Sequence, residues 1–231
     1  YWVLDIQSGK LQQLGKDRPE ATLMFDKFSP DGTRVAYVSE NNIYVETLAD
    51  GKVVQLTKDG NEKIVNGTFD WVYEEEFAFD RAFDFNADGT MLAYIRFDES
   101  HVPMYSFPWY KGLKPSLDQY SVYPGAYEYK YPMPGVDNSK VTVHTFDIKS
   151  KVTRQMDLPL DADGYIPRIK FTSDPNTLAI LTLNRHQNRL DLYFGNPKST
   201  LCKLAVRDNA EQYVKEDTYG SIAFYPENFV M

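Results

Sequence analysis

Three segments of the sequence share one pattern: Phe28-Ser-Pro-Asp-Gly-Thr-Arg-Val-Ala-Tyr-Val38, Phe85-Asn-Ala-Asp-Gly-Thr-Met-Leu-Ala-Tyr-Ile95 and Phe171-Thr-Ser-Asp-Pro-Asn-Thr-Leu-Ala-Ile-Leu181. Each segment places an aromatic residue before a short polar turn that contains Asp, and an apolar run follows the turn. Asp and Gly supply the backbone geometry of a β-hairpin turn, including a residue with positive φ. The apolar run is typical of a mostly buried strand.

Each unit continues in the same way, with a second strand, a second turn and a further strand. These continuations cover 42–56, 141–156 and 189–204, and the opening residues 1–14 repeat the strand-turn-strand pattern. Four short strands per unit, repeated every several dozen residues, are typical of a β-propeller. A β-sandwich is the structural alternative, and the repeat makes it less favourable. We predict an all-β fold, a β-propeller fragment of four-stranded antiparallel blades, with one short helix over 72–80 that carries a run of glutamates.

We interpret the whole chain, 1–231, as a partial β-propeller domain. The chain begins inside a strand-like pattern and ends without a stop signal, so both ends are expected to be cuts through a larger protein. The predicted units are a half blade over 1–15, a blade over 22–57, a blade over 64–158 with an insertion over 99–138, a blade over 164–206 and a truncated blade over 211–231.

The composition excludes several classes of protein. Apolar residues make up 42% and charged residues 25%, with a mean hydropathy of -0.48, which is typical of a soluble folded domain. The net charge of -8 disfavours binding to a nucleic-acid backbone, which needs a basic surface. The single cysteine, Cys202, excludes an internal disulfide and a Cys-rich zinc site. No apolar run approaches 18 residues, so we expect no membrane segment in this chain, and we expect no metal and no cofactor.

The insertion is unusually rich in Tyr and Pro. A disordered loop would not carry so many aromatic residues. Two interpretations remain open on composition alone: an ordered arm that folds back on its own propeller, or an arm that contacts another protein, since aromatic residues are enriched in such interfaces.

The stretch Asp70-Trp-Val-Tyr-Glu-Glu-Glu-Phe77 carries the strongest chemical signal. A solvated acidic face is the usual explanation for adjacent glutamates. Here large apolar residues flank the three carboxylates, which predicts that the carboxylates lie near a packed surface. Adjacent negative charges repel there unless a cation arrives, such as a substrate ammonium or a Lys or Arg of the protein.

The same stretch closely resembles the propeller domain of the dipeptidyl peptidase IV family. The similarity continues in the same order through Phe97-Asp-Glu-Ser-His-Val-Pro103 and Tyr129-Lys-Tyr-Pro-Met-Pro-Gly-Val-Asp-Asn138. In that family an eight-bladed propeller packs against an α/β-hydrolase domain. The enzyme releases Xaa-Pro or Xaa-Ala dipeptides from free N-termini.

The resemblance implies roles for individual residues of the motif. The last two glutamates, Glu75 and Glu76, correspond to the pair that holds the substrate α-ammonium, with Glu74, Trp71 and Tyr73 as supporting residues. An ammonium has three donors that two carboxylates can accept as charge-assisted hydrogen bonds. Holding the terminus at a fixed distance from the nucleophile makes the enzyme count two residues, which is a positioning effect.

The resemblance also implies partners and a location. In the family an arm from this blade contributes to a homodimer interface, and the matching region, 106–123, predicts a dimer arm with the aromatic residues Phe107, Trp109, Tyr110, Tyr120 and Tyr123. The expected partners of the parent protein are peptide substrates with a free N-terminus, the C-terminal hydrolase domain of the same protein and a second copy. Family members work outside the cytoplasm, so we expect an extracytoplasmic location: periplasmic, cell-surface or secreted.

The sequence departs from a complete peptidase. No Gly-x-Ser-x-Gly nucleophile elbow occurs, and none of the three histidines pairs with a serine in a recognisable motif. The chain is therefore expected to lack the Ser-Asp-His residues, which would follow Met231 in the parent. The alternative function is a non-catalytic interaction propeller that uses the aromatic arm to bind a protein partner.

Overall fold

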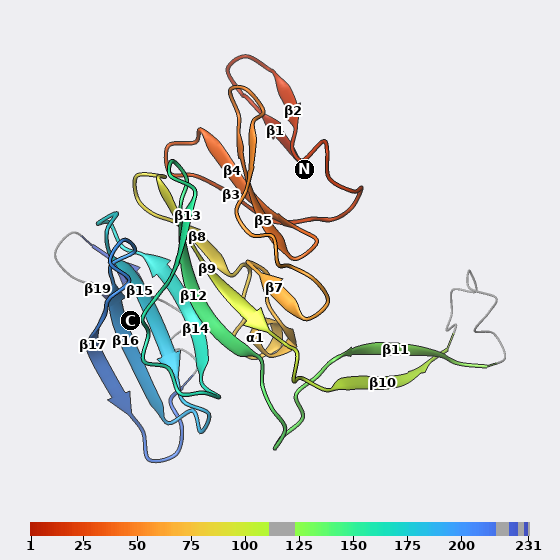
Figure 1. Cartoon of the computed structure of the whole chain (residues 1–231), viewed down its shortest axis with the longest axis vertical. Coiled ribbons are helices and arrows are strands. Elements are labelled where there is room, and N and C mark those ends of the chain that lie inside the picture. The colour runs from red at the N-terminus through yellow and green to blue at the C-terminus, as the bar shows by residue number, and fades with distance from the viewer. Residues whose placement is uncertain (111–122, 216–221, 226–228, 231) are drawn as a thin grey trace.

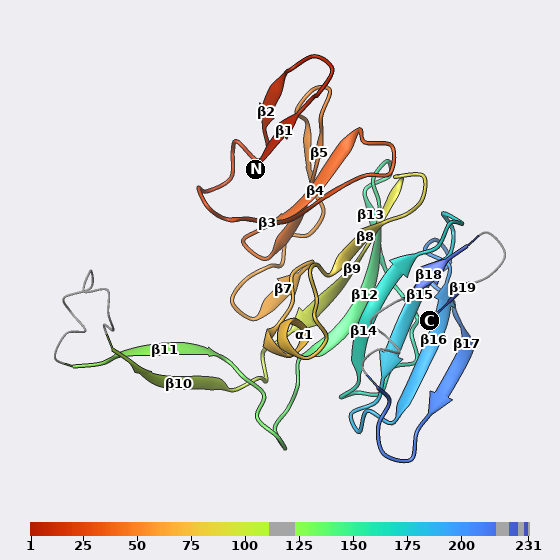
Figure 2. The same cartoon turned by 180° about the vertical axis from the view of Figure 1, so that it is seen from behind.

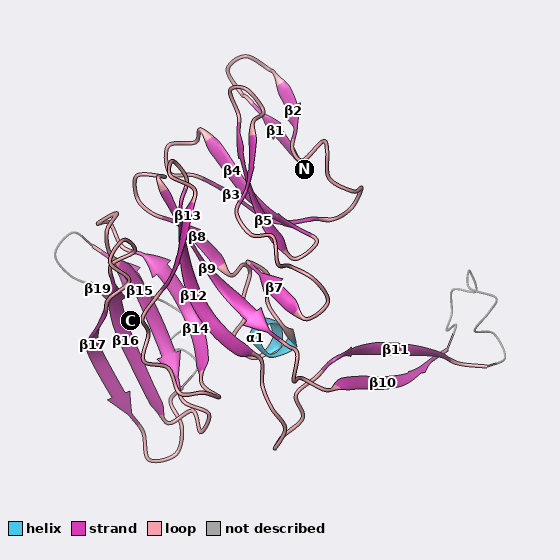
Figure 3. Ribbon diagram, viewed as in Figure 1, coloured by secondary structure: helices cyan, strands magenta, loops and turns pink. Residues whose placement is uncertain are grey.

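A computed structural model describes residues 1–110, 123–215, 222–225 and 229–230. Within these residues the chain is built almost entirely of antiparallel strands (Figures 1 and 3). The predicted all-β class and its propeller-type sheets are confirmed. No helix in the described ranges is long and apolar enough to cross a membrane.

The first complete sheet has four strands in sequence order, and its two central strands are buried on both faces. Such burial is expected when neighbouring sheets pack against both sides of a blade. The strands are β3 (Leu23–Phe28), β4 (Arg34–Ser39), β5 (Asn42–Thr47) and β6 (Val53–Gln55).

The third sheet repeats this plan, and its second strand is buried along its whole length. Its strands are β14 (Tyr165–Phe171), β15 (Leu178–Leu183), β16 (Arg189–Gly195) and β17 (Cys202–Asn209). Two short strand pairs flank the complete sheets at the two ends of the chain: β1 (Trp2–Leu4) with β2 (Leu11–Gln13), and β18 (Ala223–Phe224) with β19 (Phe229–Val230).

The middle sheet differs because its edge strand is split in two. The long strand β9 (Met91–Asp98) pairs at its start with β8 (Phe83–Phe85) and at its end with β7 (Ile64–Asn66). On its other side lie β12 (Lys140–Asp147) and β13 (Val152–Gln155). The chain therefore leaves the edge strand after β7 and rejoins it at β8.

The two ends of this excursion, 68–81, meet at one residue of β9. The Gly67 N–H donates to the Ile95 carbonyl at 3.2 Å, and the Ile95 N–H donates to the Ala82 carbonyl at 2.9 Å. The Ala82 N–H in turn donates to the Gly67 carbonyl at 3.0 Å. The inserted loop thus starts and ends on a hydrogen-bonded frame, which fixes it to the sheet.

One buried carboxylate joins the three complete sheets. Asp84 of β8 accepts a hydrogen bond from Lys27 Nζ of β3 and another, at 2.8 Å, from the Phe171 N–H of β14. A buried charge is tolerated when it is paired and hydrogen-bonded in this way. Asp84 therefore sets the relative position of the sheets around the excursion.

The hairpin that we call the arm consists of β10 (Met104–Trp109) and β11 (Gly125–Lys130). These strands pair only with each other among the described residues, and the hairpin projects away from the sheets in both views (Figures 1 and 2). The hairpin of β10 and β11 therefore does not fold back over its own propeller, which was one of the two interpretations of the insertion.

The glutamate run lies on the only helix of the described ranges, α1 (Trp71–Glu75), and extends to its C-cap residue, Glu76. This helix is shorter than the predicted 72–80. Ala78 has a positive φ of 49°, and the Phe79 N–H donates to the Tyr73 carbonyl at 3.0 Å, so the chain turns back into the core. Beyond the helix, the side chains of Phe77 and Phe79 are both buried in the core.

We predict that Gly67→Ala destabilises the chain by about 2–4 kcal/mol, because it combines left-handed backbone strain with overpacking. Gly67 has a φ of 73°, and an added Cβ would lie 2.6 Å from the Ile43 side chain. Gly51→Ala is the matched control, since Gly51 has a φ of 68° and open space around it. Urea unfolding followed by circular dichroism compares the two, and equal losses would contradict the close-packing argument.

Candidate functional site

Helix α1 begins at a buried cap. Asp70 has extended backbone geometry, and its side chain accepts a hydrogen bond from the Tyr73 N–H at 3.0 Å. This is the N-cap arrangement that satisfies a free N–H group of the first turn. A helix of this length is not stable alone in water, so contacts with the rest of the fold maintain it.

A second contact secures the cap residue. Ser139, which precedes β12, donates from Oγ to Asp70 Oδ2 at 2.5 Å. Burial raises the pKa of the Asp70 carboxyl, while its hydrogen bonds to Ser139 and to the Tyr73 N–H oppose that shift. The N-terminal end of α1 therefore depends on a residue that lies on the far side of the arm in the sequence.

Tyr73 fixes the inward face of the helix. Its hydroxyl accepts a hydrogen bond from the Ile166 N–H of β14 at 2.9 Å, which ties α1 to the third sheet. Burial raises the pKa of the Tyr73 hydroxyl well above its ordinary value, so the group stays neutral. Its ring packs against four other aromatic rings: Phe77, Phe79, Phe97 and Tyr165.

The three glutamates occupy the outward face. Because Tyr73 and Phe77 point into the core, the side chains of Glu74, Glu75 and Glu76 are exposed. None of these carboxylates forms an ion pair or a side-chain hydrogen bond with another residue that the structure describes. The run is thus a set of fixed, unpaired negative charges on a rigid support.

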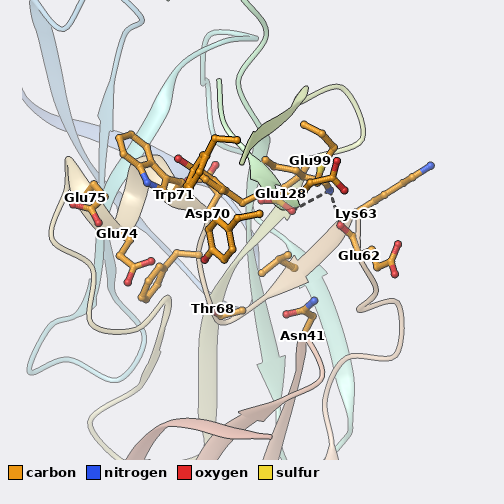
Figure 4. A pocket seen from close by; sticks show the side chains of 17 residues that line it. Asn41, Glu62, Lys63, Thr68, Asp70, Trp71, Glu74, Glu75, Glu99 and Glu128 are labelled. Carbon is orange, nitrogen blue, oxygen red and sulfur yellow. Dashed lines mark hydrogen bonds and ion pairs between the residues drawn. The ribbon is translucent and has the colours of Figure 1, made fainter. Parts of the chain in front are cut away.

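A pocket of about 1060 Å³ lies between α1 and the base of the arm (Figure 4). Glu74 and Glu75 line it on the helix side, and Glu62, Glu99 and Glu128 line it on the opposite side. Glu76 is not among the lining residues, so Glu75 alone of the predicted ammonium-binding pair borders this pocket.

Two of the acidic residues in the pocket already have structural partners. Asp70 caps the helix, and Glu99 pairs with Lys130 at 3.2 Å. Burial raises the pKa of the Glu99 carboxyl, and Lys130 opposes that shift. Lys130 also donates to the Glu62 carbonyl at 2.5 Å. Four other carboxylates of the pocket have no partner in the described part of the chain: Glu62, Glu74, Glu75 and Glu128. These four negative charges can attract a cation.

The predicted supporting residues have different surroundings. Trp71 lines the pocket and packs edge-on against Tyr131, with ring centroids 4.4 Å apart. Tyr73 lies in the core and does not line the pocket. Any support that Tyr73 gives to the glutamates therefore acts through the helix backbone.

The predicted arm residues lie on or next to the hairpin, except for Tyr120, which is outside the described residues. Phe107 is half-buried, whereas Trp109, Tyr110 and Tyr123 are exposed. Phe107 lies opposite Tyr127, and Tyr105 lies opposite Tyr129, so aromatic rings gather on one face. Sequence reasoning did not select these cross-strand partners, although their alternation over 127–131 is a visible strand signal.

Sequence reasoning also missed the polar supports of the site. Ser139 lies far from the glutamate run in the sequence, and nothing near it indicates its contact with the cap residue Asp70. Glu99 and Lys130 lie in stretches that carry the family resemblance, but the resemblance gave them no role. Among the described residues, no group of three or more His, Cys, Asp or Glu side chains is arranged to hold a metal ion.

Comparisons with known proteins define the class of this propeller region. Residues 1–228 match the family described as the dipeptidyl peptidase IV (DPP IV) N-terminal region. The chain is 37% identical over 222 residues to a probable dipeptidyl-aminopeptidase B of Talaromyces marneffei, and this match covers 92% of the chain. It is 34% identical over 195 residues to dipeptidyl peptidase 4 of Trichophyton rubrum, and this match covers 82% of the chain. The crystal structure of Porphyromonas gingivalis dipeptidyl peptidase 4 aligns over 97% of the chain, with 38% identity and a TM-score of 0.89.

This chain belongs to the dipeptidyl peptidase IV N-terminal region family. It spans only part of its relatives: each of these two fungal proteins is matched over 24% of its length, and the Porphyromonas gingivalis chain over 31%.

We predict that Tyr73→Phe costs about 1–3 kcal/mol of stability, because it leaves the buried Ile166 N–H without an acceptor. Tyr94→Phe is the control: Tyr94 is also buried, and its hydroxyl makes no hydrogen bond within the described residues. Urea unfolding gives the two costs, and hydrogen exchange at Ile166 tests the mechanism. An Ile166 amide that exchanges equally slowly in both variants would contradict it.

Proposed function

We propose that this chain is part of the substrate-recognition propeller of a serine dipeptidyl peptidase that releases Xaa-Pro and Xaa-Ala dipeptides from free N-termini. Membership of the family and the names of the relatives support the reaction class. The single observation that carries the site is the exposed glutamate run on a helix that is held at its cap, its core face and both ends of its loop.

In this proposal Glu75 and Glu76 together accept hydrogen bonds from the substrate α-ammonium, and Glu74 and Trp71 border the same helix face. Two carboxylates match the donors of one ammonium, and charge-assisted bonds are stronger than neutral ones. Contacts with the fold hold the helix in place, so the terminus is held at a fixed distance from the nucleophile. This distance places the peptide bond after the second substrate residue at the nucleophile, so cleavage occurs there.

The parent protein supplies what this chain lacks. We propose that a C-terminal α/β-hydrolase domain carries the catalytic Ser-Asp-His residues, that the arm contributes to a homodimer and that the protein works outside the cytoplasm. The exposed aromatic face of the arm supports the dimer. Within the propeller we assign 22–57, 64–158 and 164–206 to complete blades, and 1–15 and 211–231 to partial ones.

We predict that Glu75→Gln and Glu76→Gln each lower kcat/KM for a Gly-Pro chromogenic substrate roughly 10²- to 10³-fold in the parent protein, because each removes a charged acceptor of the ammonium. The N-acetylated substrate, which has no ammonium, should already be poor with the wild type and should change little in the variants. Glu211→Gln is the control, since Glu211 is also exposed and does not line the pocket.

The outcomes separate the two functional classes. Activity that is indifferent to both substitutions would make the glutamates a surface feature and would contradict the ammonium-binding role. A parent protein without peptidase activity would instead favour the interaction propeller, for which the exposed aromatic residues of the arm are the supporting observation.

A further inference from the structure

The segment 131–139, which we call the return segment, leads from the arm back to β12. It touches the glutamate helix at two points: Tyr131 packs against Trp71, the first residue of α1, and Ser139 donates to the N-cap Asp70. Both contacts lie at the N-terminal end of the helix, one turn from Glu74 and Glu75.

The return segment is itself held in place. The Tyr131 N–H donates to the Pro103 carbonyl at 3.1 Å, at the point where the arm begins. The Val136 carbonyl accepts a hydrogen bond from Arg185 at 3.1 Å, and Arg185 also lies over the Tyr165 ring of the third sheet. The segment therefore connects three elements: the arm, α1 and the third sheet.

These contacts matter because α1 has little stability of its own. Five helical residues give one turn, and nucleation of an isolated turn is unfavourable. Tyr73 and the hydrogen bonds that close the loop fix the distance of the helix from the sheet and its C-terminal part. Its N-terminal end is held through the contacts of Asp70 and Trp71. A loss of either contact would let the N-terminal turn of the helix shift while Tyr73 keeps its place in the core.

We infer that Ser139 and Tyr131 are positioning residues for the glutamate run, so that the arm and the ammonium-binding face share one support. The inference rests on the proposed function of Glu75 and Glu76. Neither residue touches the substrate in this arrangement; both act through α1. A ligand or partner that moves the base of the arm would alter recognition of the substrate N-terminus through the same two contacts.

The test measures kcat and KM separately for the Gly-Pro substrate and for its N-acetylated form in the full parent protein. Ser139→Ala should raise KM for the free amine roughly 3- to 10-fold while kcat stays within about twofold, because binding geometry is lost and the catalytic residues are untouched. Rates with the acetylated substrate should not change.

Ser39→Ala is the matched control. Ser39 is buried like Ser139, and its hydroxyl shares a 2.7 Å hydrogen bond with Thr22, but it lies in the first sheet. A purely structural loss would affect both serine variants alike, and both substrates alike. The Tyr131 pair gives an independent test: Tyr131→Leu should reproduce the rise in KM, and Tyr131→Phe should restore the wild-type value, because the ring contact with Trp71 remains.

The failure of this inference is distinguishable from that of the proposed function. If Glu75→Gln loses activity on the free amine but Ser139→Ala and Tyr131→Leu leave KM within twofold of Ser39→Ala, the positioning role is overturned and the ammonium site stands. If the glutamate variants are also indifferent, both are overturned. A free-amine KM that rises only in the Ser139 and Tyr131 variants that lose their contact supports the positioning role.

Discussion

The break in the edge strand of the middle sheet is the constraint on which the site depends. A continuous strand beside β9 would leave no room for a loop, because each residue of the edge would be used in pairing. Ile95 resolves this conflict by bonding to both Gly67 and Ala82, so that the ladder continues while the intervening residues leave the sheet. Gly67 is needed there because its φ is positive and because a Cβ at this position would clash with the Ile43 side chain. The glutamates thus lie on a loop whose two ends are hydrogen-bonded to the sheet.

Side-chain packing then orients the helix that the loop places beside the sheet. Tyr73 and Phe77 are four residues apart, so one face of the short helix enters the aromatic core, and the residues between them face outward. The hydrogen bond from the Ile166 N–H to the Tyr73 hydroxyl fixes the orientation of the helix, because it links the helix to one strand, β14, of the third sheet. Asp84 acts in the same way at a larger scale, since it receives donors from the sheets on both sides. The position of the outward glutamate face therefore depends on three sheets together.

The sequence predicts the features that depend on neighbouring residues. The Asp-Gly turns and apolar runs indicated the hairpins, and the glutamate motif indicated the short helix, although the cap at Asp70 was not predicted. The helix was predicted over 72–80, yet the left-handed Ala78 prevents its continuation and turns Phe79 into the core. Ser139, Ile166 and Tyr131 could not be predicted to support the site, because their contacts with α1 span about sixty residues or more of chain and leave no local pattern.

The acidic residues around α1 fall into two groups, buried carboxylates with partners in the fold and exposed carboxylates without them. Asp70 and Glu99 are buried, and each has donors within the fold that offset the cost of removing a carboxylate from water. Glu74, Glu75 and Glu76 remain in water and keep their hydration, so they can be held side by side without a partner cation in the protein. In the proposed role, a substrate ammonium would exchange that hydration for charge-assisted hydrogen bonds without any change in the fold. The same three charges would destabilise the core if they were buried, and they would bind nothing if the fold supplied their counter-ions.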